Sequence, residues 1–437
     1  MHCLVTVAAF IGIAADEVSA QPRPAPREPR AVYRNVTVIT PNDSVVRERM
    51  AIVVRGERIA AIVPVASLTA AHLDSATVWD GNGAFVLPGL MDAHVHLATS
   101  PDRVDAEREF KRLVYSGVTS ARDMAGDARS LAELSRMAMM HEVPAPDFFY
   151  SALMAGPSFF SDPRPAASAA GLTPGRVPWM QEMVDTTDIR LAVARARGTG
   201  ATGIKVYANL AGDLVEKIIA EGKRQGIPVW THLQVYPATP YHSLGATAAS
   251  HVAMIARWIL EPGKQAYGHA GHPPCDALRA DHPELVKYFA ALARSGTILD
   301  ATLSLDSLPG VAPAPGRVRC SGRLAGELVA AAVRAGVPIA TGTDRTTPPT
   351  AGYPALHDEL ETLVKVAGLS PRDVITAATL NGARTIGRER DYGTIEAGKY
   401  ASLVFVRANP LTDISNLRTV VLTVKRGKQY PRAAYRP

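Results

Sequence analysis

The stretch VLPGLMDAHVHLATS, residues 86–100, decides the fold class of this chain. An apolar run ends there in two histidines, His94 and His96, which stand one residue apart. Because alternate residues of a strand point to the same side, a strand that ends His-x-His offers two imidazole nitrogens to one point in space. Taken alone, such a pair is better explained by polar residues that meet solvent at a strand end, so the rest of the chain must distinguish the two explanations.

The middle of the chain alternates short apolar runs with amphipathic segments such as residues 213–226 and 284–296. A strand followed by a helix, repeated eight times, predicts an α/β fold, the parallel (β/α)8 barrel, with helices covering the sheet. The eight runs that are typical of buried strands are residues 87–97, 117–124, 147–156, 203–208, 227–233, 248–255, 297–305 and 337–344.

The two ends of the chain have a different character from its middle. Residues 31–86 and 389–437 contain short runs rich in β-branched residues, bounded by Gly, Asn and Asp, and such runs are typical of strands joined by turns. We expect the two segments to pair into one small β-sandwich domain, with the barrel spanning residues 87–388 between them.

Residues 1–20 resemble a secretory signal peptide that ends in the small-x-small pattern Val18-Ser19-Ala20, although no positive charge precedes the apolar part apart from His2. A Pro/Arg-rich linker follows at residues 21–30. This pattern predicts export to the periplasm or the medium, and no segment is long enough to span a membrane. Removal of the signal would leave Cys275 and Cys320, either as a disulfide or as two unrelated thiols.

The composition is that of a globular protein with a large core: 437 residues, 47% hydrophobic and 20% charged. The net charge of +6 is spread along the chain without a basic block that contains aromatic residues, so we expect no nucleic-acid partner. The positive field mildly favours small acidic substrates. Assembly into a homo-oligomer stays open.

Polar side chains stand at the ends of five of the predicted strands, and the C-terminal ends of barrel strands form the mouth where active sites lie. Each has a simple alternative: a histidine satisfied within the core, a lysine that reaches solvent, or an aspartate that caps a helix. Chance rarely places six such polar residues on the strands in barrel order. They are His94, His96, Lys205, His232, His251 and Asp344.

This order across a barrel, flanked by a split β-sandwich, resembles the metal-dependent amidohydrolase superfamily. Residues 87–97 and 117–124, together with the tail from TAATLNGARTIG (376–387) through GTIEAGKYASLVFV (393–406), are similar to its imidazolonepropionase- and prolidase-like branch in particular. The resemblance extends over nearly the whole chain after the signal segment.

Imidazole and carboxylate ligands suit Zn²⁺ and similar divalent ions, whereas a lysine ammonium repels a metal. Burial lowers a lysine pKa, and the neutral amine reacts with CO₂ to give a carbamate, a modification that the resemblance implies for Lys205. The resemblance therefore implies two divalent ions, zinc by preference. One is held by His94, His96, carbamylated Lys205 and Asp344, and the other by the same carbamate with His232 and His251.

Two such ions share a hydroxide that acts as the nucleophile, with Asp344 as general acid and base. The sequence thus predicts a hydrolase of amide bonds in small molecules, such as dipeptides, X-Pro dipeptides or N-acyl amino acids. Opening of a cyclic amide, imide or lactone is an alternative within enzymes, and a metal-free scaffold is an alternative outside them. A mononuclear aminohydrolase fits less well, because such relatives carry His-x-x-Glu where His232 is followed here by Leu-Gln-Val.

Three further residues have two readings each. By resemblance Tyr207 contacts the substrate, and otherwise it is a packed aromatic. Arg345 pairs with a substrate carboxylate or faces outward. Asp92 orients a ligand imidazole or supports the barrel floor.

Residues 151–180 depart from the related branch, which commonly has a Gly-Gly-His stretch there, because this segment contains no histidine. Phe159, Phe160, Trp179 and Met180 instead suggest an apolar wall or lid over the site. We therefore expect substrates with a bulky hydrophobic group.

Overall fold

The computed structural model describes residues 30–97, 102–233, 237–260, 275–307 and 320–437. Eight parallel strands form the barrel, and a hydrogen bond from the Ala93 amide to the Thr341 carbonyl (2.8 Å) connects the first strand to the segment after the last. The predicted (β/α)8 barrel is confirmed. In chain order its strands are β6 (Leu90–Val95), β7 (Val118–Asp123), β8 (Asp147–Ala155), β11 (Gly203–Val206), β12 (Val229–His232), β13 (Ala248–Ser250), β14 (Ile298–Asp300) and β15 (Ile339–Ala340).

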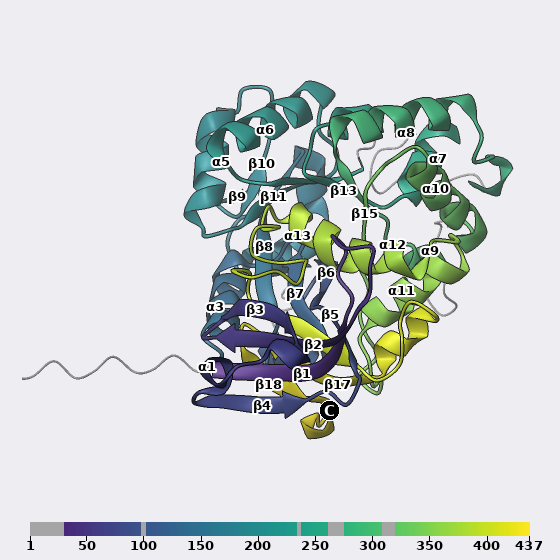
Figure 1. Cartoon of the computed structure of the whole chain (residues 1–437). Helices are drawn as coiled ribbons and strands as arrows, with labels where there is room; N and C mark the ends of the chain where they lie inside the picture. The colour runs from purple at the N-terminus through teal and green to yellow at the C-terminus, as the bar shows by residue number, and fades with distance from the viewer. Residues whose placement is uncertain (1–29, 98–101, 234–236, 261–274, 308–319) are drawn as a thin grey trace, which may run out of the picture.

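Helices cover the outside of the barrel (Figure 1). Their apolar faces lie on the strands, as Leu214, Ile218 and Ile219 of α6 illustrate, and side chains such as Asp102 and Ser321 accept hydrogen bonds from their first turns. The longer helices are α2 (Arg103–Tyr115), α3 (Ala128–Met139), α5 (Ile189–Gly198), α6 (Gly212–Gln225), α7 (Ala253–Leu260), α8 (Pro283–Ser295), α10 (Gly322–Arg334) and α11 (Ala355–Lys365). The shorter ones are α1 (Ala70–Leu73), α4 (Pro163–Ala169), α9 (Ser304–Ser307), α12 (Pro371–Thr376) and α13 (Gly382–Thr385).

An insertion follows β8 at the mouth of the barrel. It contains the 3₁₀ helix η2 (Pro157–Ser161), α4, β9 (Arg176–Val177) and β10 (Met180–Glu182). Strand β10 pairs in parallel with the end of β8, which places this insertion beside the site.

The two ends of the chain build a second, eight-stranded sheet, at the bottom of Figure 1. Antiparallel pairing of β5 with β16 joins the N-terminal and C-terminal strands, and Tyr33, Trp79 and Phe405 pack together in its core. The predicted small β domain made of both ends is therefore confirmed. Its strands are β1 (Arg30–Val38), β2 (Arg47–Arg55), β3 (Arg58–Pro64), β4 (Ala76–Asp80), β5 (Phe85–Pro88), β16 (Leu403–Val406), β17 (Val420–Lys425) and β18 (Lys428–Pro431).

A buried ion pair connects this sheet to the barrel. Lys425 of β17 is fully buried, its Nζ lies 3.2 Å from Asp147 Oδ1 at the start of β8, and it donates to the Ala138 carbonyl. Tyr392 donates its hydroxyl to the other oxygen of Asp147 at 2.9 Å. The pair lies at the start of β8, so it holds the β domain against the end of the barrel opposite the mouth.

Cys275 and Cys320 are joined by a disulfide, and both are buried. The structure thus decides between the two alternatives that the sequence left open. The bond links the segment before α8 to the segment before α10, which follow different barrel strands.

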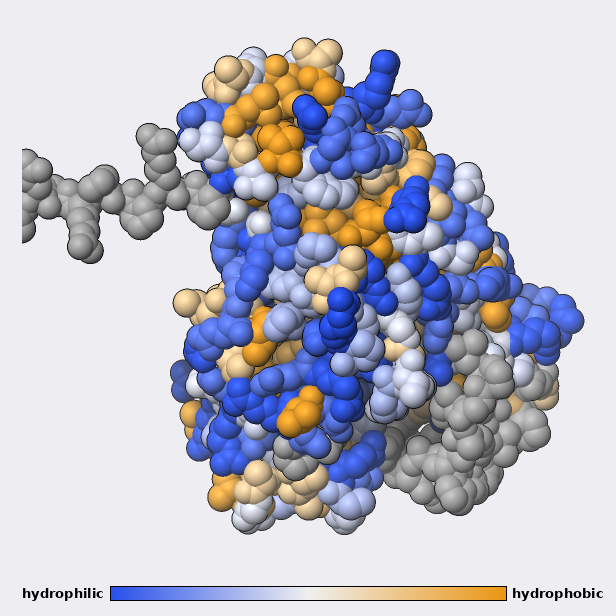
Figure 2. Space-filling model, turned by 90° about the horizontal axis from the view of Figure 1, so that it is seen from below, coloured by the Kyte–Doolittle hydropathy of each residue, from blue (hydrophilic) through white to orange (hydrophobic). Residues whose placement is uncertain are grey.

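On the face viewed from below, hydrophilic side chains cover much of the surface, and hydrophobic ones gather in separate patches among them (Figure 2). No helix in the described part of the chain is both long and apolar enough to cross a membrane. The predicted signal peptide and all but the last residue of the linker lie outside the described residues.

Candidate active site

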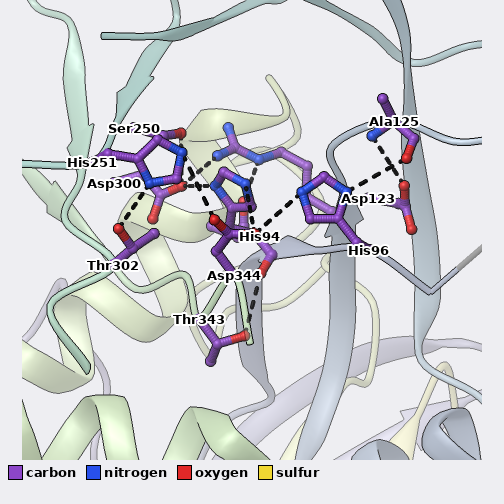
Figure 3. Close-up of polar contacts among 12 residues, drawn as sticks. His94, His96, Asp123, Ala125, Ser250, His251, Asp300, Thr302, Thr343 and Asp344 are labelled. Carbon is purple, nitrogen blue, oxygen red and sulfur yellow. Dashed lines mark hydrogen bonds and ion pairs between the residues drawn. The ribbon is translucent and has the colours of Figure 1, made fainter. Parts of the chain in front are cut away.

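Three of the sequence-predicted ligands meet at the mouth of the barrel, where β6 and the segment after β15 lie side by side. The Nε2 atom of His96 lies 3.2 Å from Asp344 Oδ1, and that of His94 lies 3.7 Å from the same oxygen. One ligand atom from each of the three lies within 4.8 Å of the others. Figure 3 shows these side chains facing one another.

Two more histidines complete a continuous group. The rings of His251 and His94 have centroids 4.9 Å apart, and those of His232 and His251 are 4.6 Å apart. His251 Nε2 also lies 3.9 Å from Asp344 Oδ2. The histidines predicted from the sequence therefore converge on one side of Asp344, at the ends of β6, β12 and β13.

Lys205 occupies β11 in the floor of this group. Its side chain is 1% exposed, and its Nζ has no hydrogen-bond partner among the described residues. Burial lowers the pKa of Lys205 to about 7, although the Asp344 carboxylate opposes this effect. A buried lysine amine without a partner is costly, so this position favours a chemical change of the amine or a ligand beside it.

Hydrogen bonds hold the histidines in the tautomer that a metal needs. The Nδ1 atom of His94 donates to Asp300 (2.8 Å), that of His232 to the Leu233 carbonyl (2.8 Å), and that of His251 to Thr302 Oγ1 (3.0 Å). A neutral imidazole that donates from Nδ1 carries its lone pair on Nε2.

The charge states agree with this tautomer. Burial lowers the pKa of His94 and His251 well below the usual range and that of His232 to about 3. Burial alone would raise the pKa of Asp344, but nearby His94, His96 and Lys205 outweigh it and lower that pKa. His96 differs, because its hydrogen bond and ion pair with Asp344 outweigh burial and raise its pKa. The neutral imidazoles of His94, His232 and His251 beside an ionised carboxylate form a donor set that fits a divalent ion.

The carboxylate that orients His94 is Asp300, at the end of β14. Its Oδ2 accepts from His94 Nδ1, from Arg122 Nη2 (3.1 Å) and from Ser250 Oγ (3.0 Å), and both Asp300 and Arg122 are fully buried. Burial raises the pKa of Asp300 to about 6 and lowers that of Arg122 to about 10, so both are charged at neutral pH.

The sequence reasoning missed Asp300 and Arg122. One signal was present, because Asp300 stands within the seventh apolar run as His232 stands within the fifth. Of the two readings of Asp92, its contacts support the structural one, since none of them is to an imidazole. It accepts instead from the His94 amide (3.1 Å) and from the amide and hydroxyl of Thr343 (3.1 and 2.9 Å), and thereby holds the first and last strands together.

Several residues of the site have a left-handed backbone. The φ angle is 46° at Asp344, 79° at His251, 49° at Thr302 and 132° at Ala125, whose carbonyl lies 3.5 Å from His96 Nδ1. Non-glycine residues rarely adopt such angles, and they persist where the surrounding structure over-determines them, often at functional sites.

A cavity of about 680 Å³ opens above the histidines. Tyr207 and Arg345 line it, together with the apolar side chains of Leu153, Phe159 and Met180. Tyr207 packs edge-on against His232 and Phe159, with ring centroids 4.9 and 4.8 Å away.

Phe160 and Trp179, which we expected to form the apolar wall, are not among the cavity-lining residues. Trp179 is 7% exposed and donates its indole N–H to the Ser168 carbonyl at 3.2 Å. Phe159 and Met180, the other two residues expected in the wall, do line the cavity. Neighbouring residues of an extended segment face opposite sides, which is why Met180 faces the cavity and Trp179 does not.

Such a site at the mouth of a (β/α)8 barrel, in a chain whose two ends build a separate β domain, defines a class of metal-dependent hydrolases. The sequence pattern of the amidohydrolase family matches residues 85–430, and the chain belongs to this family.

Known proteins of three kinds are similar to it in sequence or in structure. An imidazolonepropionase from Deinococcus radiodurans is 24% identical over 91% of this chain and 92% of its own length. Among solved structures, a Xaa-Pro dipeptidase with bound methionine has a TM-score of 0.69 at 20% identity and covers 92% of this chain and 100% of that one. The A. niger ochratoxinase also has a TM-score of 0.69 at 20% identity, over 93% and 96% of the two chains.

The family and the site together show the general activity. The protein is a metal-dependent hydrolase that acts on carbon–nitrogen bonds of small molecules, and its sequence is similar to those of imidazolonepropionases.

Proposed function

We propose that this protein is a binuclear hydrolase of acyclic amide bonds. The observation that carries the proposal is the buried Nζ of Lys205, which has no hydrogen-bond partner in the described part of the chain. Lys205 lines the same cavity as His94, His96 and His251. A carbamate at this position would replace an uncompensated amine by an anion with two oxygens, enough to contact two ions.

The residues divide into two sets around that lysine. His94, His96 and Asp344 lie together, within 4.8 Å at their ligand atoms, and would hold one ion. His232 and His251, with ring centroids 4.6 Å apart, would hold the other. The carbamate of Lys205 would serve both, and the mixture of imidazole and carboxylate ligands favours zinc.

When bound, the two ions would supply Lewis acidity toward the scissile carbonyl and lower the pKa of the attacking water. Asp344 lies 3.2 Å from His96 and lines the cavity, so its carboxylate is placed to take the proton of that water. The same carboxyl then delivers the proton to the leaving nitrogen. Tyr207 packs against Phe159 and His232 and lines the cavity, so it would contact the substrate there.

A direct test of the lysine uses isotope-labelled bicarbonate. The protein, loaded with zinc in ¹³C-bicarbonate, should show one carbamate carbon by NMR and about two zinc ions per chain by elemental analysis. Lys205→Ala should lose the carbamate signal and at least one ion.

Lys425 provides the matched control, because it is also a buried lysine but is paired with Asp147 at 3.2 Å. Lys425→Met should keep the signal and both ions. A Lys205→Ala variant that retains full activity and two ions would overturn the binuclear proposal.

Substrates separate the remaining alternatives. The metal-loaded protein is incubated with X-Pro dipeptides, N-acyl amino acids, cyclic imides and lactones, and loss of each is followed by mass spectrometry beside a chelated sample. Chelator-sensitive cleavage of acyclic amides supports the proposal. Ring opening alone would replace it by the cyclic-substrate alternative, and a protein that binds no metal would be a scaffold.

A further inference from the structure

Arg345 follows Asp344 directly and lines the cavity above the histidines. Its Nη1 atom is buried and has no hydrogen-bond partner among the described residues, and within the same residues no carboxylate lies within ion-pair distance of its guanidinium. The side chain as a whole is half-buried, but a buried guanidinium nitrogen without a hydrogen-bond acceptor is unfavourable, so this position favours an anionic group of the substrate.

The other two arginines that line the cavity differ in this respect. Arg108 forms an ion pair with Asp105, and Arg164 forms one with Asp162 at 2.9 Å. Their charges are thus compensated within the protein. Arg345 is therefore the lining arginine that has its charge left for a ligand, and a guanidinium binds a carboxylate through two parallel hydrogen bonds.

The place of Arg345 beside Asp344 tells which half of the substrate carries that carboxylate. In the proposed function Asp344 delivers a proton to the leaving nitrogen, so its neighbour contacts the amine half. The apolar wall of Leu153, Phe159 and Met180 comes from β8 and the insertion after it, three strands around the barrel from β15. That wall suits an apolar acyl half.

The acidic residues at the cavity rim are engaged with the protein. Asp102 accepts from the Val104 and Asp105 amides. Glu109 lies 3.0 Å from Arg112 and accepts from Thr347 at 2.9 Å. With Asp105 paired to Arg108, these groups are poorly suited to bind the ammonium of a dipeptide.

We infer, on the basis of the proposed function, that the substrates are N-acylated amino acids with an apolar acyl group, and that Arg345 selects them by binding the α-carboxylate. Water adds its oxygen to the acyl carbon and a proton to the nitrogen as the C–N bond breaks. The products are a carboxylic acid and a free amino acid.

The test compares N-octanoyl-leucine with N-octanoyl-leucinamide, which lacks only the anionic carboxylate. For the wild-type protein we expect kcat/KM to be roughly 10- to 100-fold higher for the acid, the range of a charge-assisted hydrogen-bonded pair. Arg345→Gln should remove this preference while kcat/KM for the amide changes by less than about threefold. Arg108→Gln, at a cavity arginine that is already paired, should keep the preference.

Calorimetry measures how tightly both compounds bind to the chelated protein, without any turnover. It therefore distinguishes a failure of this inference from a failure of the proposed function. The acid should bind more tightly than the amide to wild type and equally to Arg345→Gln, whether or not turnover occurs. Equal binding of both compounds to wild type would refute the role of Arg345. Absence of amide hydrolysis with selective binding intact would instead refute the proposed function. Faster hydrolysis of leucyl-leucine than of N-octanoyl-leucine would refute the substrate class.

Discussion

Replacing Asp300 by Asn removes a carboxylate that has two tasks. It accepts from His94 Nδ1 at 2.8 Å, and it compensates the charge of Arg122, which is fully buried, at 3.1 Å. Loss of one partner from a buried ion pair costs about 3–5 kcal/mol, chiefly because the other charge is left uncompensated. Loss of the anion behind a ligand histidine lowers metal affinity by about 10- to 100-fold. We therefore expect both effects in Asp300→Asn.

The double variant Arg122→Met/Asp300→Asn removes the uncompensated charge but does not restore the anion beside His94. It should recover about 2 kcal/mol or more of the free energy of unfolding relative to Asp300→Asn, because the uncompensated charge is gone. Its zinc affinity should stay about 10- to 100-fold below wild type. Urea titration of the metal-free protein measures the first quantity, and competition with a chromophoric chelator measures the second.

Asp147 is the matched control, since it is a buried carboxylate paired with Lys425 at the opposite end of the barrel, 3.2 Å away. Asp147→Asn should lose about 3–5 kcal/mol of stability and keep wild-type zinc affinity. If the double variant regains full zinc affinity, or if Asp147→Asn loses as much affinity as Asp300→Asn, Asp300 does not orient His94 in the way described.

Further predictions concern stability and specificity. Burial lowers the pKa of His357 to about 3, so its contribution to stability is complete above the unfolded pKa of about 6.5 and is lost as the pH falls toward 3. Between pH 7 and pH 5 this contribution amounts to about 2 kcal/mol. Because other buried histidines contribute in the same range, urea titrations should show a loss of stability in wild type that exceeds the loss in His357→Leu by about 2 kcal/mol. Equal losses in the two proteins would contradict this prediction. Zinc at 100 times its dissociation constant should stabilise the fold by about 2.7 kcal/mol. This stabilisation should appear as a rise in Tm that a chelator reverses. A Tm that does not change when the chelator is added would argue against a zinc site in the folded protein. Phe159→Ala should raise KM for amides with bulky acyl groups about tenfold, as expected for a lost aromatic contact. Phe160→Ala should leave the ratio of KM values for bulky and acetyl substrates unchanged. Steady-state kinetics with both kinds of substrate measures these ratios, and equal effects of the two variants would show that Phe159 does not form the wall.

Much of this architecture could be predicted because it depends on local patterns. Each barrel strand is a short apolar run, and a residue at the C-terminal end of such a run points into the mouth wherever the strand lies in the barrel. For this reason the candidate ligands, from His94 to Asp344, could be named from their positions at strand ends. The two β-rich ends likewise carried their own turn and strand signals.

Only the tertiary structure decided which groups meet across the chain. His94 and Asp300 are 206 residues apart and Arg122 and Asp300 are 178 residues apart, yet they form one buried network. No local sequence pattern encodes a contact between residues so far apart in the chain, because the contact forms only when the barrel closes. The same holds for the direction of Trp179, for the bond between Cys275 and Cys320, and for the uncompensated charge of Arg345. Local sequence thus determined the elements and the candidate ligands, while packing determined their partners.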